Sequence, residues 1–229
     1  MICLIPASGL ALLPYSQDFE NLMLGSLDSN PALADDGWLV FGNVFDPDGN
    51  YLFGYGPFPA PNHFTAFCAV IADQGGPGQG SQQLVVYNDY NSDQHPLGNL
   101  IESNVFQEQI IGPGDVGETW VFDFQAKLGD LQAPSTALAF IKTLDPDAGF
   151  ALTNFITVDM TTIPTTWSDF SISIMIDGAL DGQILQFGFA NTAANYVASG
   201  VFYDNVNFYI DGPVGTEENT WGGVKSLYR

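Results

Sequence analysis

The sequence predicts an all-β protein built as an antiparallel β-sandwich, and three observations carry that prediction. The 229 residues include 25 glycines and 14 prolines, so few windows long enough for a helix are free of a helix breaker. Several segments alternate apolar and polar residues with the two-residue period of a half-buried strand. Turn-forming clusters of Gly, Pro and Asp separate these segments. Together they predict about nine or ten strands without intervening helices.

The strand candidates follow one another along most of the chain. In order they are YSQDFENL (15–22), GWLVFGNV (37–44), HFTAFCAVIA (63–72), SQQLVVYND (81–89), SNVFQEQI (103–110), TWVFDFQAKLGD (119–130), STALAFIKTL (135–144), SDFSISIMID (168–177), QILQFGFAN (183–191) and GVFYDNVNFYI (200–210). Alternation assigns the core-facing side of three of them. These sides are Trp120, Phe122, Phe124, Ala126 and Leu128; Phe170, Ile172, Ile174 and Ile176; and Leu185, Phe187 and Phe189.

The pattern indicates one domain over residues 15–211, because no low-complexity linker interrupts it. Residues 1–14 form an apolar N-terminal arm or the remnant of a secretory signal, and both interpretations stay open. Residues 212–229 are a spacer followed by a docking tail, TWGGVKSLYR. No apolar run is long enough for a membrane-spanning helix.

The charge balance excludes several classes of partner. Four cations, Lys127, Lys142, Lys225 and Arg229, oppose 26 acids, and the formal net charge is −22. Nucleic acids and anionic membranes are bound through clustered Lys and Arg, which this chain does not have. The field of the whole molecule would also repel anionic polysaccharides. A neutral ligand or another copy of the chain is the expected partner.

Asp204 is the most informative acid in the sequence. Alternation in the last strand candidate places Asp204 on one face with Phe202, Val206, Phe208 and Ile210. A buried carboxylate needs a counter-charge, hydrogen bonds or a metal ion. Because cations are scarce here, a Ca²⁺ ion with oxygen ligands is the expected counter-ion. A hydrogen-bonded Asp204 in an edge strand is the alternative.

A family resemblance points the same way. DFEN (18–21), DGW (36–38), TWVFDFQAK, TWSDFSISI, LQFGFAN and FYDNVNF occur in that order. Together they resemble the calcium-bearing jelly-roll carbohydrate-binding modules attached to many secreted glycoside hydrolases. The resemblance implies a jelly roll over about residues 15–210, with a structural Ca²⁺ held by Glu20 and Asp204. Asp18 lies in the same acidic cluster. It also implies a secreted, extracellular or cell-surface protein that binds glycans without catalysis.

A weaker metal candidate is the DPDGN segment at 46–50. Asp46, Asp48 and Asn50 offer oxygens at alternate positions, as calcium loops do. The complete EF-hand pattern is absent, because the glycine falls one place early and the closing glutamate is missing. A solvated turn is the preferred interpretation.

Two segments could stack aromatic rings on a neutral glycan. Tyr51 and Tyr55, with Phe53 and Phe58, fall in a Gly/Pro-rich stretch expected to be a loop. In the second segment, Gln83, Tyr87, Asn88 and Tyr90 combine rings with hydrogen-bonding groups. Most aromatic side chains of such a chain must lie in the core, so core packing is the competing interpretation for both. Trp38, Trp120 and Trp167 are expected in the core.

The sequence does not predict an enzyme. His63 and His95, the two histidines, lie in no nucleophile or zinc-binding motif. Acid pairs are so numerous that a glycosidase dyad could be drawn anywhere. No catalytic residue is therefore assigned.

The alternative function is a self-assembling structural subunit of an extracellular filament, surface layer or matrix. The arm and the tail would then make the subunit contacts. The tail residues expected to dock are Trp221, Val224, Lys225, Leu227, Tyr228 and Arg229. Whether Cys3 and Cys68 form a disulfide is left open by the sequence.

Overall fold

The computed structural model describes residues 11–26 and 30–212. Within these ranges the chain forms twelve strands in two six-stranded sheets, one short α-helix and three 3₁₀ turns. The strands are β1 (Tyr15–Gln17), β2 (Leu39–Phe45), β3 (Tyr51–Pro59), β4 (Cys68–Ala72), β5 (Gln82–Val86), β6 (Leu100–Ile110), β7 (Thr119–Leu128), β8 (Thr136–Asp145), β9 (Ala151–Asp159), β10 (Ser168–Met175), β11 (Ile184–Ala193) and β12 (Val201–Ile210). The helix is α1 (Ala32–Asp35), and the 3₁₀ turns are η1 (His95–Leu97), η2 (Pro146–Ala148) and η3 (Gly178–Leu180).

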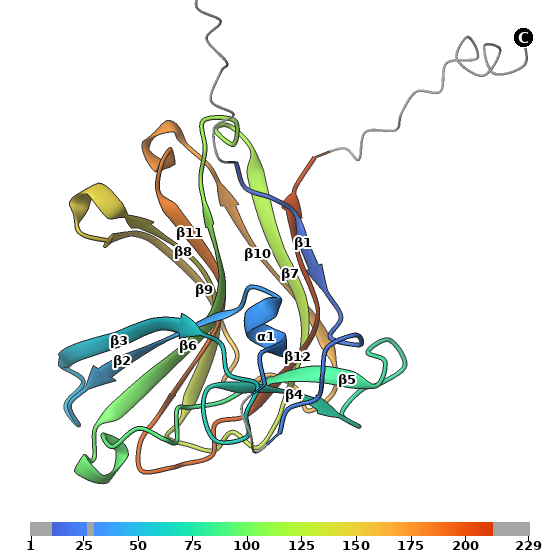
Figure 1. Ribbon diagram of the computed structural model, residues 1–229, viewed down its shortest axis with the longest axis vertical. Coiled ribbons are helices and arrows are strands. Elements are labelled where there is room, and N and C mark those ends of the chain that lie inside the picture. The colour runs from blue at the N-terminus through green and yellow to red at the C-terminus, as the bar shows by residue number, and fades with distance from the viewer. Residues whose placement is uncertain (1–10, 27–29, 213–229) are drawn as a thin grey trace, which may run out of the picture.

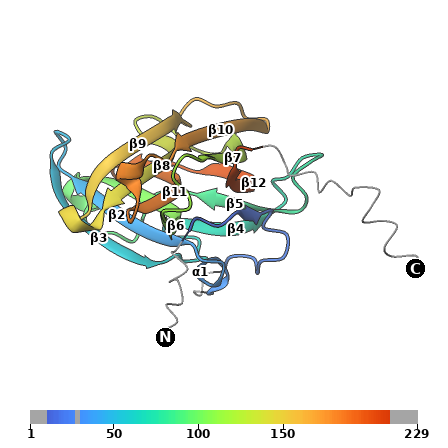
Figure 2. The same cartoon turned by 90° about the horizontal axis from the view of Figure 1, so that it is seen from above.

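The two sheets face each other as a β-sandwich, which confirms the predicted fold class. The β12 sheet has the order β10-β7-β12-β5-β4, and β1 also pairs with β12. The β11 sheet has the order β3-β2-β6-β11-β8-β9. In Figure 1 the β2–β3 and β8–β9 hairpins lie at opposite ends of the curved β11 sheet, and Figure 2 shows the two layers from above.

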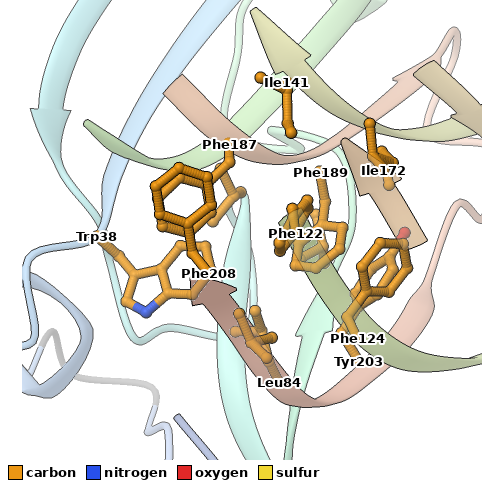
Figure 3. Packing of buried hydrophobic residues seen from close by; sticks show 14 of the residues in the cluster. Trp38, Leu84, Phe122, Phe124, Ile141, Ile172, Phe187, Phe189, Tyr203 and Phe208 are labelled. Atoms are coloured by element: carbon orange, nitrogen blue, oxygen red, sulfur yellow. The ribbon is translucent and has the colours of Figure 1, made fainter. Parts of the chain in front are cut away.

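Stacked aromatic rings join the two sheets in the core (Figure 3). Phe189 on β11 lies 3.6 Å from Tyr203 on β12, and Phe187 lies 4.2 Å from Phe208, both measured between ring centroids. The core-facing sides predicted for residues 120–128, 170–176 and 185–189 all pack in or against this cluster. Trp38 and Trp120 are also buried there, as predicted.

Two strands escaped the sequence-based prediction, and both are edge strands of the β11 sheet. The expected loop at 51–58 is in fact strand β3, paired with β2. Strand β9, paired with β8, was not predicted at all. Both are mostly exposed, so neither needs the clean apolar alternation that marks a half-buried strand.

The core-facing side predicted for the last strand is wrong at Phe202 and Asp204 and correct at Val206 and Phe208. The register of β12 against β7 shifts between Asp204 and Asn207, and Asn205 has a left-handed φ of 47°. This bulge places Tyr203, Val206 and Phe208 in the core. Asp204 directly follows Tyr203 in the strand, so its side chain points to the face of the sheet opposite the core.

Some predicted features have other surroundings or lie outside the described ranges. Trp167 is half-buried outside the core, where its Nε1 donates to the Gln74 carbonyl at 3.1 Å. No helix among the described residues has the length and apolarity to cross a membrane. The tail at 213–229, with every predicted docking residue, and Cys3 fall outside the described ranges, so those predictions stay predictions. Cys68 is a buried thiol.

Candidate functional site

Asp204 is buried, as the sequence predicted, although a loop rather than the core covers it. The side chain is 0% exposed. Oδ1 accepts the backbone N–H of Asn205 at 2.6 Å, whereas Oδ2 is buried and has no hydrogen-bond partner among the described residues. The covering loop is residues 73–81, whose Gly78 carbonyl accepts from Asn205 Nδ2 at 2.9 Å. An orphaned carboxylate oxygen in such a place suits a cation ligand.

Glu20 lies at the other side of the same loop. Its Oε1 accepts the backbone N–H groups of Ser81 and Gln82, each at 2.6 Å. Asp18 Oδ1 in turn accepts the N–H of Glu20 at 3.2 Å. The three acids that the sequence singled out therefore lie around the 73–81 loop. Asp18 and Glu20 come from the segment after β1, and Asp204 comes from β12.

The electrostatics of this site are unbalanced. Burial raises the pKa of Asp204 to about 7. The Asn205 N–H and the nearby Gln83 amide act in the opposite direction, and the negative charges of Glu20 and Asp18 raise it further. Among the described residues, no three His, Cys, Asp or Glu side chains form a ready metal cluster. A metal would therefore need carbonyl and amide oxygens besides the carboxylates, a mixture that Ca²⁺ accepts. Gln79 Oε1, another buried oxygen without a partner in the described structure, belongs to the same loop.

Gly80 fits this site because it has no side chain. A Cβ at this position would lie 2.4 Å from Glu20 Oε1, and φ is +56°. We expect Gly80→Ala to lower the free energy of unfolding by about 1–3 kcal/mol, through overpacking and backbone strain. Chemical denaturation measures this loss. Gly78→Ala is the matched control in the same loop, because its Cβ would meet nothing within 4 Å. Equal losses in the two variants would contradict the placement of Glu20.

The weaker metal candidate, DPDGN, forms the turn between β2 and β3. Asp46 Oδ1 accepts the N–H groups of Asp48 and Asn50 at 3.0 and 2.8 Å, and Oδ2 accepts Asn50 Nδ2 at 2.9 Å. These bonds lower the pKa of the exposed Asp46. The turn's own donors thus satisfy this carboxylate, in contrast to Asp204.

An aromatic pocket opens on the outer face of the β12 sheet. Its volume is about 570 Å³, within the range of about 300–1,000 Å³ typical of ligand sites. It is lined by Phe64, Val85, Tyr87, Tyr90, Asp130, Tyr196, Ala198, Gly200 and Phe202. Tyr87 and Tyr90, both predicted as stacking residues, thus lie in one pocket.

The pocket's inner tyrosines are held rigidly. Tyr87 and Tyr90 stack with ring centroids 6.2 Å apart and planes 6° from parallel. The Tyr90 hydroxyl lies 2.8 Å from the Val197 carbonyl and 2.6 Å from Ser199 Oγ, and the Tyr87 hydroxyl donates to the His63 carbonyl. Burial raises the pKa of both phenols, so they stay neutral at physiological pH. Such anchoring limits the entropy lost when a ligand stacks on them.

The pocket's outer groups were not predicted from the sequence. Phe64 and Tyr196 are about half exposed, at 47% and 53%. Asn195 and Tyr196 have left-handed φ values of 51° and 60°, a conformation that is costly for residues other than glycine. Asp130 is exposed, and its Oδ1 accepts the N–H of Gly200 at 2.8 Å. The strained turn at Asn195–Tyr196 is a local feature of the chain. The other outer groups, Phe64 and Asp130, come from loops that are distant in the sequence.

The remaining predicted glycan residues lie elsewhere. Asn88 is buried, and its Nδ2 donates to the carbonyls of Ile101 on β6 and Asn191 on β11 at 2.6 and 2.8 Å, which ties the segment after β5 to both strands. Gln83 is buried beneath the 73–81 loop, where its Nε2 donates to the Gln79 carbonyl. Tyr51 is exposed on β3, and the Tyr55 hydroxyl donates to Asp89 at 2.8 Å. The structure does not bring these four into the aromatic pocket.

Comparisons with known proteins show a resemblance of fold. No family model matches the chain, and no curated protein matches it. Solved structures similar to it include the enzymatically active domain of bacteriophage CBA120 tailspike protein 4, at 14% identity and a TM-score of 0.49 over 85% of this chain. The chain spans 22% of the length of that tailspike chain.

Two further structures give the same result. The CBM22-1 xylan-binding domain from Paenibacillus barcinonensis is 10% identical, with a TM-score of 0.39 over 62% of this chain and 81% of that domain. A cyclase from Fischerella sp. TAU is 11% identical, with a TM-score of 0.47 over 85% of this chain and 93% of the cyclase. At such low identities and scores, the function has to be inferred from the site itself.

Proposed function

We propose that this protein is a non-catalytic module that binds a neutral glycan in the aromatic pocket of the β12 sheet. The observation that carries the proposal is the stacked Tyr87–Tyr90 pair beside the half-exposed rings of Phe64 and Tyr196. Flat rings contact the apolar faces of sugars, and the Asp130 carboxylate accepts hydrogen bonds from sugar hydroxyls.

The charge of the chain favours a neutral ligand over an acidic one. Its net charge is −22, and the pocket itself contains the acid Asp130. A uronic acid or sulfated sugar would be repelled both over long range and inside the site. Uncharged hydroxyls meet no such penalty.

Calcium is proposed as a structural ion at the 73–81 loop. Glu20 and Asp204 would hold it, with Asp18 contributing negative charge nearby. A bound Ca²⁺ would neutralise the orphaned oxygen of Asp204 and tie β1 to β12 through the loop. Its role in this proposal is stability, because the pocket's rings lie outside this loop.

The setting proposed for this function is outside the cell or at its surface. A calcium-stabilised module that recognises glycans finds both its ion and its ligand there. The self-assembly alternative depends on the arm and the tail, and no contact among the described residues favours it over glycan binding.

The proposal is tested with soluble neutral polysaccharides, such as xylan, β-glucan and galactomannan, in saturating Ca²⁺. We expect the wild type to bind at least one of them in affinity electrophoresis and calorimetry. Tyr196→Ala should weaken that binding by about tenfold, since losing a stacking anchor costs more than about 1 kcal/mol.

Tyr51→Ala is the matched control, because Tyr51 is a similarly exposed tyrosine on a different strand. Its affinity should equal that of the wild type. Loss of binding in Tyr51→Ala with normal binding in Tyr196→Ala would move the site to β3. Absence of binding to every neutral polysaccharide would overturn the proposed function.

A further inference from the structure

The β11 sheet has a second apolar cluster on the face opposite the core. Phe106 on β6, Phe140 on β8 and Ala190 on β11 are nearly completely buried there, and Phe41 and Leu138 pack against them. Phe106 and Phe140 are both paired with Gly188. Because Gly188 has no side chain, no group of β11 separates the two rings.

Lys142 extends over this cluster. Its Nζ lies 4.7 Å from the Phe140 ring centroid and 5.3 Å from that of Phe106. The same Nζ lies 3.4 Å from Asn104 Oδ1, so a lysine of β8 reaches an amide of β6 across the intervening β11. The amide carbon is about 1.2 Å from that oxygen, and small rotations bring it to the amine.

A carboxylate lies on the other side of the same amide. Asn104 Nδ2 donates to Glu102 Oε1 at 3.1 Å, and Asn43 Nδ2 holds the same oxygen at 2.8 Å. Amine, amide and carboxylate thus meet above two phenyl rings. This arrangement supplies a nucleophile, an electrophile and a proton carrier in partly desolvated surroundings.

Lys127 provides an internal comparison. It also lies over two rings, those of Trp167 and Phe202, and its Nζ lies 3.4 Å from Gln74 Oε1. In the described structure, however, no carboxylate accepts a hydrogen bond from the Gln74 side-chain amide. Lys127 therefore has the amide and the rings but not the proton carrier.

We infer that Lys142 and Asn104 form an intramolecular isopeptide bond, with Glu102 as the catalytic acid–base. The neutral Lys142 amine attacks Cγ of Asn104, and an Nζ–Cγ bond forms. Glu102 takes a proton from the attacking nitrogen and passes it to Nδ2. The Cγ–Nδ2 bond then breaks and ammonia leaves, so the reaction needs no oxidant and no cofactor.

The electrostatics of Lys142 agree with this chemistry. Burial lowers its pKa to about 8, although Glu102 and Glu108 act in the opposite direction. A substantial fraction of the amine is therefore neutral near physiological pH, as a nucleophile must be. The product would be an amide, which removes a charge from an apolar site and covalently links β6 to β8.

Mass spectrometry of the denatured, full-length chain tests the bond. We expect the wild type to be about 17 Da lighter than its sequence mass, from the loss of one ammonia. Lys142→Met and Glu102→Gln should each have the full mass calculated for their sequences. Asn104→Asp should lose about 18 Da instead, because water replaces ammonia as the leaving group.

Two further measurements locate the bond. Digestion of the wild type should yield a branched peptide that joins residues 104 and 142. Lys127→Met should keep both the branched peptide and the mass loss. A wild type at full sequence mass, a mass loss without this branched peptide, or a link through Lys127 would each overturn the inference.

Discussion

In calcium-free buffer above pH 7, we expect the Asp204→Asn variant to be more stable than the wild type. The wild type should gain stability when Ca²⁺ is added, whereas the variant should not. Asp204 Oδ2 is buried without a partner among the described residues, so the ionised carboxylate is costly unless a cation neutralises it. The asparagine side chain has nearly the same shape and no charge.

The pH dependence of this difference follows from the raised pKa. Asp204 has a pKa of about 7 in the folded protein, whereas an aspartate in the unfolded chain titrates near its ordinary value of about 4. Between these values the folded state binds the extra proton, so wild-type stability falls as the pH rises through this window. At about 1.4 kcal/mol per pKa unit, the loss relative to Asp204→Asn reaches roughly 4 kcal/mol above pH 7.

Thermal and chemical denaturation at several pH values, with chelator or with Ca²⁺, measure both effects. Asp46→Asn is the control, because Asp46 belongs to the other candidate calcium segment and is satisfied by its own turn. This variant should keep the wild-type response to Ca²⁺. A response lost in Asp46→Asn and kept in Asp204→Asn would place the ion at the β2–β3 turn instead.

Phe189→Ala should lower the free energy of unfolding by about 3–5 kcal/mol, as expected when a buried phenyl ring is removed. Phe189 is 0% exposed and stacks on Tyr203 of the opposite sheet. It also contacts the rings of Phe124 and Trp38. A cavity here therefore removes contacts that join both sheets, and the sheets cannot close it without disturbing their other pairs.

Urea denaturation measures this loss, and Phe58→Ala is the control. Phe58 is the same residue type, but it is 51% exposed on the edge strand β3. Its removal should change the unfolding free energy by no more than about 0.5 kcal/mol. Similar losses in both variants would contradict the assignment of Phe189 to the central core.

Most of the core could be predicted because its pattern is local. Trp120, Phe122 and Phe124 alternate with polar residues, and this alternation determines which face is buried wherever the strand lies in the sheet. The same rule failed in β12, where the bulge after Asp204 changed the phase. A single residue in a left-handed conformation is enough to shift the alternation, and no local sequence pattern predicted such a residue here.

The candidate site was predictable only in part, for the same reason. Tyr87 and Tyr90 stood out as aromatic residues near polar ones, and they do lie in the pocket. No sequence pattern marked Phe64, Asp130 and Tyr196 as members of one site, because each belongs to a different loop and only the fold brings them together. Gln83 and Asn88 looked like sugar ligands in sequence, but the fold uses them as buried internal hydrogen-bond donors.

The sequence by itself determined the sandwich and most of its apolar faces, and its charge balance predicts an uncharged partner. These properties follow from the composition of the whole chain and from a two-residue period that is visible among a few neighbouring residues. The tertiary structure alone decided which loops form the aromatic pocket and that Lys142 meets Asn104 across β11. Such contacts depend on strand order and register, which bring together residues far apart in the chain.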